Sequence, residues 1–440
     1  MKNKKWMAIL LGGIMAASLA APCSVSAAEK TTLTFWHAMG GTNGEVLQQI
    51  VDDFNASQDE IEVKAEYQGT YDDTITKLKA AMQSDSGLPD VCQMYDVGTK
   101  FMYDSGAVIP VEDKFESTGY DKSSVMDVIS SYYTVDGKQY AMPFNVSTPM
   151  LYYNKDVFEA AGLDPETPPT TYDEVLEDAK KIVESGAAPV GYSQAIYGWF
   201  FEQQLAGLGV TYGNNDNGRT EAVTAVDFDS NGGGLKVFDM WKKLYDSGYF
   251  EDYGTTTADT QTAFFSGQVG MIIESTAILK NAVDSSPFEV GTGYLPRIEQ
   301  NDEGGVIIGG GSLWLTDTGN EANEDAAWKF IEYITTPDVQ AKWSMGTGYF
   351  AINEKAYETD DMKAYLAENP NFETAINQLK DSPVNCNTAG VLSGVQTEAR
   401  LTFNEIMPQV YDGKLTTQDA VDQLAASVNK AIENYNESIK

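Results

Sequence analysis

The residue types that carry most enzyme chemistry are scarce in this chain. His37 is the only histidine among 440 residues, so it cannot build a histidine metal cluster and would have to serve any Ser/His/Asp triad alone. It follows a strand-like segment at residues 32–36, where a structural hydrogen-bonding role is the expected one. The sequence also lacks a glycine-rich loop ending in Lys-Ser or Lys-Thr, which excludes a P-loop ATPase. We therefore expect no metal, no cofactor and no catalytic residue.

Carboxylates are the exception, because the chain carries 65 aspartates and glutamates. A glycoside hydrolase needs two of them flanking the scissile bond. No spacing in the sequence singles out such a pair. A secreted glycoside hydrolase is therefore the alternative from another functional class, and turnover of oligosaccharides would distinguish it from a binding protein.

The N-terminal residues predict export. Lys2, Lys4 and Lys5 precede an apolar run at residues 6–21, and small residues then end in a cleavage pattern at Ala27. Residues 1–27 are thus expected to be a signal peptide, placing the protein in the periplasm or at the outer face of the cytoplasmic membrane. Lipid attachment at Cys23 is the alternative, although the preceding residues fit that signal poorly.

Charge and cysteine content limit the partners. The net charge of −36 becomes more negative once the three N-terminal lysines are removed, and such a surface repels nucleic acid. Besides Cys23 only Cys92 and Cys386 remain, and we expect two buried free thiols rather than a disulfide.

The first third of the chain alternates between strand and helix patterns. A β-branched and aromatic segment at residues 32–36 is followed by apolar residues at helical spacing over 46–54. Strand patterns at 61–65 and 91–94 enclose a second helical pattern at 75–82. This order predicts an α/β fold with a largely parallel sheet and helices on both faces.

The same pattern continues through the remaining chain. Thr171 and Glu174 form a predicted capping box, and helices are also expected at residues 237–244, 326–334 and 421–435. Residues 306–315 are apolar and interrupted by glycines, which indicates a strand approached closely by a ligand or by another backbone.

Ordered motifs along this framework resemble one family. They include FWHAM at 35–39, QMYDVGT at 93–99, PFNVSTP at 143–149, FSGQVGM at 265–271 and IGGGSLW at 308–314. Together they look like the extracellular solute-binding proteins of ABC carbohydrate importers, and most of all like the members that bind glycerol 3-phosphate. The resemblance runs from about Leu33 to the C-terminus.

That resemblance implies a two-lobed periplasmic-binding-protein fold with a hinge of several crossing strands. We assign residues 28–142 with 283–320 to the first lobe, and 143–282 with 321–440 to the second. It also implies a monomer that takes a sugar or polyol from solution, an ABC permease in the membrane as partner, and a cytoplasmic ATPase acting indirectly.

The family's positions supply the candidate site. Asp96 would accept two ligand hydroxyls where the glycerol-phosphate binders have glutamate, and Trp199 would stack on the solute. The full set of predicted ligand-binding residues is Tyr71, Asp96, Ser147, Trp199, Ser275, Thr276, Gly309, Gly310 and Tyr349.

Three departures from the family bear on the ligand. Asp96 is one methylene shorter than glutamate, a second cleft tryptophan falls on Ile196, and the arginine that grips phosphate falls on Leu392. A charged hydrogen bond contributes about 1.5–3 kcal/mol, so its loss penalises a phosphomonoester. The sequence therefore favours a neutral sugar or short oligosaccharide, with glycerol 3-phosphate or a glycerophosphodiester as the alternative.

Overall fold

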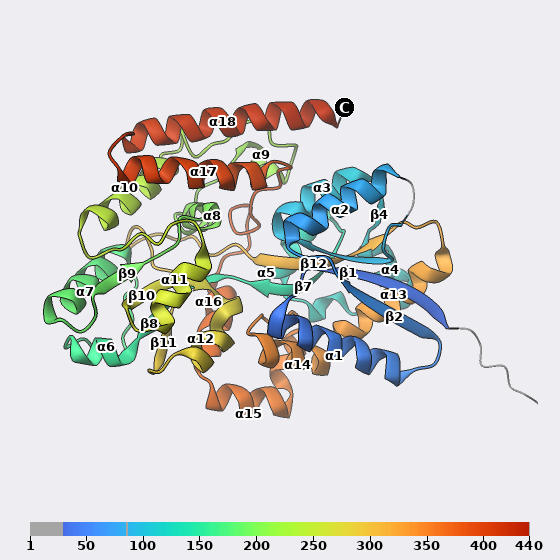
Figure 1. The fold of residues 1–440 in the computed structure, drawn as a ribbon. Helices are drawn as coiled ribbons and strands as arrows, with labels where there is room; N and C mark the ends of the chain where they lie inside the picture. The colour runs from blue at the N-terminus through green and yellow to red at the C-terminus, as the bar shows by residue number, and fades with distance from the viewer. Residues whose placement is uncertain (1–29, 85–86, 440) are drawn as a thin grey trace, which may run out of the picture.

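The computed structural model describes residues 30–84 and 87–439. The predicted signal peptide at residues 1–27, including Cys23, lies outside the described residues. Figure 1 shows two lobes side by side, with the N-terminal strands in one and the final helix pair on the other. The described residues thus form the predicted two-lobed α/β fold.

The first lobe is built on a six-stranded sheet with the order β2-β1-β3-β12-β4, in which β7 also pairs with β12. Its strands are β1 (Thr31–His37), β2 (Ile61–Tyr67), β3 (Val91–Tyr95), β4 (Val108–Ile109), β7 (Met142–Ser147) and β12 (Gly309–Thr316). Leu33 and Phe35 of β1 are fully buried. Alternate residues of a strand point to the same face of the sheet, so this face of β1 packs against the core.

Helices cover both faces of this sheet, and a short hairpin lies beside it. These elements are α1 (Gly41–Ser57), α2 (Tyr71–Gln83), α3 (Thr99–Ser105), α4 (Val111–Thr118), α5 (Asp127–Ser130), β5 (Thr134–Val135), β6 (Lys138–Gln139), α13 (Glu321–Ile334) and α14 (Pro337–Thr347). Helix α1 places Leu47, Ile50, Val51 and Phe54 in the core, so the helical spacing seen in the sequence is confirmed.

The second lobe contains a four-stranded sheet with the order β11-β8-β10-β9. Its strands are β8 (Pro149–Asn154), β9 (Val190–Ser193), β10 (Val269–Ser275) and β11 (Val290–Gly293). Its helices are α6 (Lys155–Ala160), α7 (Tyr172–Ser185), α8 (Gly198–Gly207), α9 (Asn214–Gly218), α10 (Gly233–Asp246), α11 (Thr257–Phe265), α12 (Leu279–Ser285), α17 (Gln396–Tyr411) and α18 (Thr417–Ser438). Helices α17 and α18 lie side by side across the outer surface of this lobe (Figure 1). The predicted capping box at Thr171 and Glu174 opens α7.

Both sheets have mixed orientation, which corrects the expectation of largely parallel sheets. In the first, β1 runs parallel to β2 and β3, but β12 is antiparallel to β3, β4 and β7. In the second, β10 is parallel to β9 and antiparallel to β8. The antiparallel strands are those next to the crossings between the lobes, a feature that local sequence patterns do not reveal.

The chain passes between the two sheets at three places. The first is Thr148 between β7 and β8, the second is residues 294–308 between β11 and β12, and the third is residues 382–395 after α16 (Asn371–Asp381). Helix α16, preceded by α15 (Asp360–Glu368), contacts β11, and its Phe372 and Leu379 are buried in a core cluster to which both lobes contribute.

Several elements lie in a different lobe from the one assigned from sequence. Strand β7 and helix α14 were assigned to the second lobe but belong to the first, because β7 pairs with β12 and α14 packs on α1. Strand β11 falls within 283–320 yet pairs with β8 in the second sheet. Helix α13 falls within 321–440 yet packs on β1, with the Phe330 ring 5.5 Å from that of Phe35. A helical periodicity identifies the buried face of a helix but not the sheet that covers it.

The remaining sequence-based expectations concern cysteines, metals and membrane segments. Neither Cys92 nor Cys386 forms a disulfide, and Cys92 is buried as expected while Cys386 is only partly buried. Burial raises the pKa of the Cys92 thiol to about 12, so it stays protonated. Residues 30–84 and 87–439 contain no cluster of three or more potential metal ligands. In the same part of the chain, no helix is both long and apolar enough to span a membrane.

Candidate ligand-binding site

A cavity of about 260 Å³ lies where the two lobes meet. The first lobe and the strand β12 supply Tyr71, Tyr95, Asp96, Ser147, Gly309, Gly310 and Tyr349. The second lobe supplies Tyr197, Trp199, Thr257, Gln261, Glu274, Ser275, Ala277, Ile278 and Arg400. We call this space the cleft cavity. Because its walls come from both lobes, a solute held there contacts both.

Eight of the nine predicted site residues line the cleft cavity. Thr276 is the exception, since it is fully buried and its hydroxyl accepts the backbone N–H of Thr148 at 3.2 Å. It therefore holds the first crossing between the lobes instead of facing the cavity. Of the two neighbouring hydroxyl residues predicted from sequence, only Ser275 lines the cleft cavity.

A chain of hydrogen bonds orients Tyr71. The Ala38 N–H donates to Gln93 Oε1, Gln93 Nε2 donates to Asn145 Oδ1, and Asn145 Nδ2 donates to the Tyr71 hydroxyl at 2.7 Å. Burial raises the pKa of Tyr71 well above its usual value, so the phenol keeps its proton. Because the hydroxyl accepts from Asn145, its own proton is directed to another acceptor, and the neighbouring Tyr349 hydroxyl is one.

Bare backbone forms the wall at Gly309 and Gly310. Gly310 has φ of +90°, and a side chain there would place Cβ 1.9 Å from the carbonyl oxygen of Asn145. A Cβ at Gly309 would lie 2.7 Å from the Trp199 ring. Strand β12 therefore has to be glycine at both positions to pass between β7 and the cavity, as the glycine-interrupted pattern predicted.

Arg400 is the residue that sequence reasoning missed most clearly. Its Nη2 donates to Asp96 Oδ2 and to Glu202 Oε2, both at 2.7 Å, and its Nε donates to Glu202 Oε1 at 2.8 Å. The arginine and Asp96 line the cavity, while Glu202 lies behind them on α8. All three side chains are 8 % exposed or less. The guanidinium is thus engaged on two edges by carboxylates before any ligand arrives.

Glu274 is a second carboxylate of the cavity that the sequence analysis did not identify. It is 4 % exposed, and its oxygens accept from Gln261 Nε2 at 3.0 Å and from the Ser275 N–H at 2.7 Å. Burial raises the pKa of this carboxyl. Its position directly before Ser275 on β10 was the available signal, although a single glutamate in a strand gives no local indication of its surroundings.

Neither of the other two arginines, Arg219 and Arg297, lines the cleft cavity. Arg219 donates to the backbone carbonyls of Tyr132, Ala389 and Gly390, and so joins a first-lobe segment to the third crossing. The predicted phosphate-gripping position is occupied by Leu392, which is 4 % exposed. Ile196, at the place of the second family tryptophan, is fully buried in the second lobe's core.

His37 has a structural environment. It is 6 % exposed, and its Nδ1 accepts the N–H of Met39 at 3.3 Å. Burial lowers the pKa of the imidazole to about 4, so it is neutral at physiological pH. His37 is not among the residues that line the cleft cavity.

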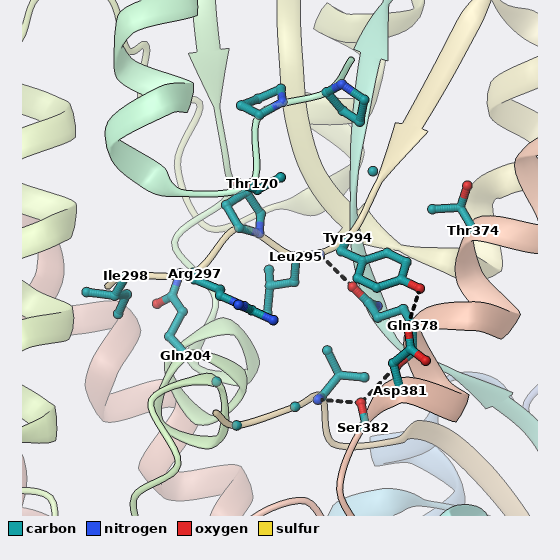
Figure 2. A pocket seen from close by; sticks show the side chains of 18 of the residues that line it. Thr170, Gln204, Tyr294, Leu295, Arg297, Ile298, Thr374, Gln378, Asp381 and Ser382 are labelled. Carbon is teal, nitrogen blue, oxygen red and sulfur yellow. Dashed lines mark hydrogen bonds between the residues drawn. The ribbon is translucent and has the colours of Figure 1, made fainter. Parts of the chain in front are cut away.

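A larger cavity of about 550 Å³ lies beside the second and third crossings (Figure 2). We call it the hinge cavity. The Tyr294 hydroxyl donates to Asp381 on one wall at 2.8 Å, and the Val306 N–H donates to Ser382 Oγ. Arg297 reaches into it without a hydrogen bond or ion pair from its guanidinium to any described residue, and it is exposed to solvent. None of the predicted site residues lies in this cavity.

Known proteins resemble the chain over most of its length. The family model described as bacterial extracellular solute-binding protein matches residues 49–374. The sn-glycerol-3-phosphate-binding periplasmic protein of Escherichia coli (strain K12) is 30% identical over 417 residues, covering 93% of this chain and 94% of that protein.

Solved structures share the fold. The cyclic alpha-maltosyl-1,6-maltose binding protein from Arthrobacter globiformis superposes with a TM-score of 0.76 at 26% identity, covering 92% of this chain and 100% of that one. UgpB from Mycobacterium tuberculosis, solved in complex with glycerophosphocholine, gives a TM-score of 0.79 at 21% identity, covering 93% and 100%. These relatives are binding proteins, so the glycoside hydrolase alternative is wrong. The chain belongs to the bacterial extracellular solute-binding proteins and is the solute-binding component of an ABC importer, not an enzyme.

Proposed function

We propose that the cleft cavity binds a neutral sugar or short oligosaccharide and that the closed protein delivers it to a membrane permease. Tyr71, Asp96, Ser147, Trp199, Ser275 and Tyr349 would contact the ligand, with backbone groups of Gly309 and Gly310 on one side. Carboxylate and hydroxyl oxygens suit sugar hydroxyls, while aromatic faces suit the C–H surface of a pyranose. A volume of about 260 Å³ favours a small sugar over a long chain.

The observation that carries this proposal is the state of Arg400. It is the only arginine or lysine among the residues lining the cleft cavity, and its guanidinium is held by Asp96 and Glu202. A phosphate would have to compete with two carboxylates for that cation and would also approach their negative charge. The buried Leu392 offers no replacement.

The relatives support both of the ligand classes under consideration. The Arthrobacter globiformis protein is named for an oligosaccharide, and the Escherichia coli protein for glycerol 3-phosphate. Glycerol 3-phosphate or a glycerophosphodiester is thus the second candidate. The carboxylates around Arg400 favour the first.

Delivery would follow from lobe closure about the three crossings. A solute that touches both lobes stabilises the closed form because it binds that form more tightly than the open one. The closed monomer would be recognised by the permease, and the cytoplasmic ATPase would act through that permease. Export through the segment at residues 1–27 would place the protein in the periplasm or, with Cys23 lipidated, at the outer face of the membrane.

Calorimetry on the mature protein tests the ligand class. We expect at least one neutral mono- or disaccharide to bind more tightly than glycerol 3-phosphate and glycerophosphocholine. If either phosphate compound binds more tightly than every neutral sugar, the proposal is wrong. Substituting Tyr71 by Phe should weaken sugar binding by about tenfold, the value of one lost hydrogen bond in a buried site. Tyr103→Phe, which removes an exposed hydroxyl bonded to Asp136, is the matched control.

A further inference from the structure

One ionisable group of the cleft cavity has no counter-charge. Glu274 is 4 % exposed, and both groups that donate to its carboxylate, the Gln261 amide and the Ser275 N–H, are neutral. No lysine or arginine within the described ranges forms an ion pair with it. A buried carboxylate without a counter-charge costs several kcal/mol if it is ionised. The wall of the cleft cavity therefore carries a carboxylate that is destabilised when it is ionised.

The rest of the cavity does not supply the missing positive charge. Arg400 is the sole cation on its walls, and Asp96 and Glu202 already bind it. Two carboxylates thus hold the guanidinium, and Glu274 is a third carboxylate of the region without a cation of its own. When all three carboxylates are ionised, the net charge of this region is negative. A cationic group on the ligand would offset that charge.

Two aromatic rings line the cleft cavity together with Glu274. The Tyr197 and Trp199 rings are 6.1 Å apart between centroids, and both line the cavity with Glu274. Tyr197 also interacts electrostatically with Glu274, whose negative charge helps to raise the pKa of that phenol. Aromatic faces attract cations by about 0.5–2 kcal/mol, depending on their desolvation. The Arg400 guanidinium already lies 5.9 Å from the centre of the Tyr197 ring. The Glu274 carboxylate and the Trp199 ring are therefore the groups of the cavity that suit an ammonium group.

We propose that the preferred ligand is an amino sugar whose protonated amine binds the Glu274 carboxylate in the cavity that the Trp199 ring also lines. This inference rests on the proposed function, because it keeps a phosphate-free sugar in the cleft cavity. It changes the expected charge of that sugar from neutral to positive. Gln261 would hold the Glu274 carboxylate in place from α11.

Matched ligand pairs provide the test. Calorimetry on the mature protein would compare glucosamine, galactosamine and mannosamine with glucose, galactose and mannose, and with the three N-acetylated sugars. We expect at least one amino sugar to bind at least tenfold more tightly than both the parent sugar and the N-acetylated sugar. The absence of such a gain in all three pairs, including the absence of any binding, overturns the inference.

Two variants assign the preference to Glu274. In Glu274→Gln the ratio between amine and neutral sugar should fall to about one, while Asp259→Asn should keep it. Asp259 is an exposed carboxylate on the same helix as Gln261, so its variant makes the same charge change outside the cavity. Both affinities in the ratio are measured on the same variant, so a change in the stability of that variant affects them equally.

The outcomes separate this inference from the proposed function. An amine preference that survives Glu274→Gln overturns the inference. Equal binding of amines and neutral sugars does the same and leaves the neutral-sugar proposal standing. Tighter binding of glycerol 3-phosphate than of any sugar, charged or uncharged, overturns both.

Discussion

At the residue scale, the group formed by Asp96, Glu202 and Arg400 connects stability with selectivity. Its members are 8 % exposed or less and lie far apart in sequence, with 304 positions between Asp96 and Arg400. Because Asp96 belongs to the first lobe and Arg400 to α17 of the second, the ion pair joins the lobes across the cleft cavity. Removing one member would leave the others with unpaired buried charge.

We expect Arg400→Ala to lower the free energy of unfolding by about 3–5 kcal/mol, because it leaves two buried carboxylates without their cation. Urea denaturation followed by tryptophan fluorescence measures the loss. Arg297→Ala is the matched control and should change the free energy by less than about 0.5 kcal/mol, since its exposed guanidinium has no bonded partner among the described residues. Similar losses in both variants would contradict the role given to Arg400.

Glu274 predicts a pH-dependent difference in stability. Burial raises the pKa of its carboxyl above the usual value of 4.5, so the folded state holds this proton more tightly than the unfolded state does. Its contribution is therefore fully present below about pH 4.5 and is lost as the pH rises through the folded-state pKa. Without ligand, Glu274→Gln should be more stable than the parent at neutral pH.

Thermal unfolding of both proteins between pH 4.5 and 8 checks this expectation. The stability difference should shrink towards the acidic end, where both side chains are neutral. A difference that stays constant with pH would show that Glu274 is not the titrating group.

At the scale of elements, Gln378 of α16 links two of the crossings. Its Oε1 accepts the Leu295 N–H, and its Nε2 donates to the Pro149 carbonyl at 2.7 Å and to Thr148 Oγ1 at 3.3 Å. The side chain is 5 % exposed. Figure 2 shows the bond to Leu295. One amide therefore holds the first and second crossings against the helix that leads into the third.

Gln378→Ala should reduce the free energy of unfolding by about 1–3 kcal/mol, because a buried N–H and a buried carbonyl lose their partner. Gln418→Ala should have almost no effect, since that exposed side chain bonds only to Asp422 in its own helix. Parallel denaturation curves measure both. Equal stability of the two variants would show that the crossings do not depend on this amide.

Local sequence patterns predicted most of the helices and strands, but they did not predict which sheet each element packs against. The strand at residues 32–36, the helix carrying Val46 to Phe54 and the capping box at Thr171 were predicted, because each is determined by neighbours in the sequence. The lobe assignments of β11 and α13 were not, since they depend on which sheet lies opposite. Motif order placed Tyr71, Asp96 and Gly310 at the site. Arg400 and Glu274 carry no comparable local signal, and only the fold brings them to the cavity.

At the scale of the whole molecule, hydrogen bonds other than those of Arg400 also hold the lobes together. The Tyr95 hydroxyl donates to Asp72, so it accepts from Thr397 on α17 at 2.9 Å. The Tyr435 hydroxyl of α18 donates to Asp104 of α3 at 2.7 Å. These contacts exist only when α17 and α18 lie against the first lobe.

Thr397→Val should therefore weaken the closed form. We expect about a two- to tenfold loss of ligand affinity and a larger radius of gyration without ligand, measured by calorimetry and small-angle X-ray scattering. Thr402→Val removes a hydroxyl that bonds only to Glu398 within the same helix, and should change neither quantity. An unchanged radius and affinity in Thr397→Val would mean that this bond does not contribute to closure.

Glu202 lies behind Arg400 and does not line the cavity, yet it occupies two of the guanidinium's donors. Which solutes the importer accepts can thus be altered from a position that no solute reaches. Replacing that single acid by glutamine would remove one negative charge beside the arginine, and we expect it to raise the affinity for anionic solutes. The ligand preference of such a binding protein can therefore change during evolution without any substitution among the residues that contact the ligand.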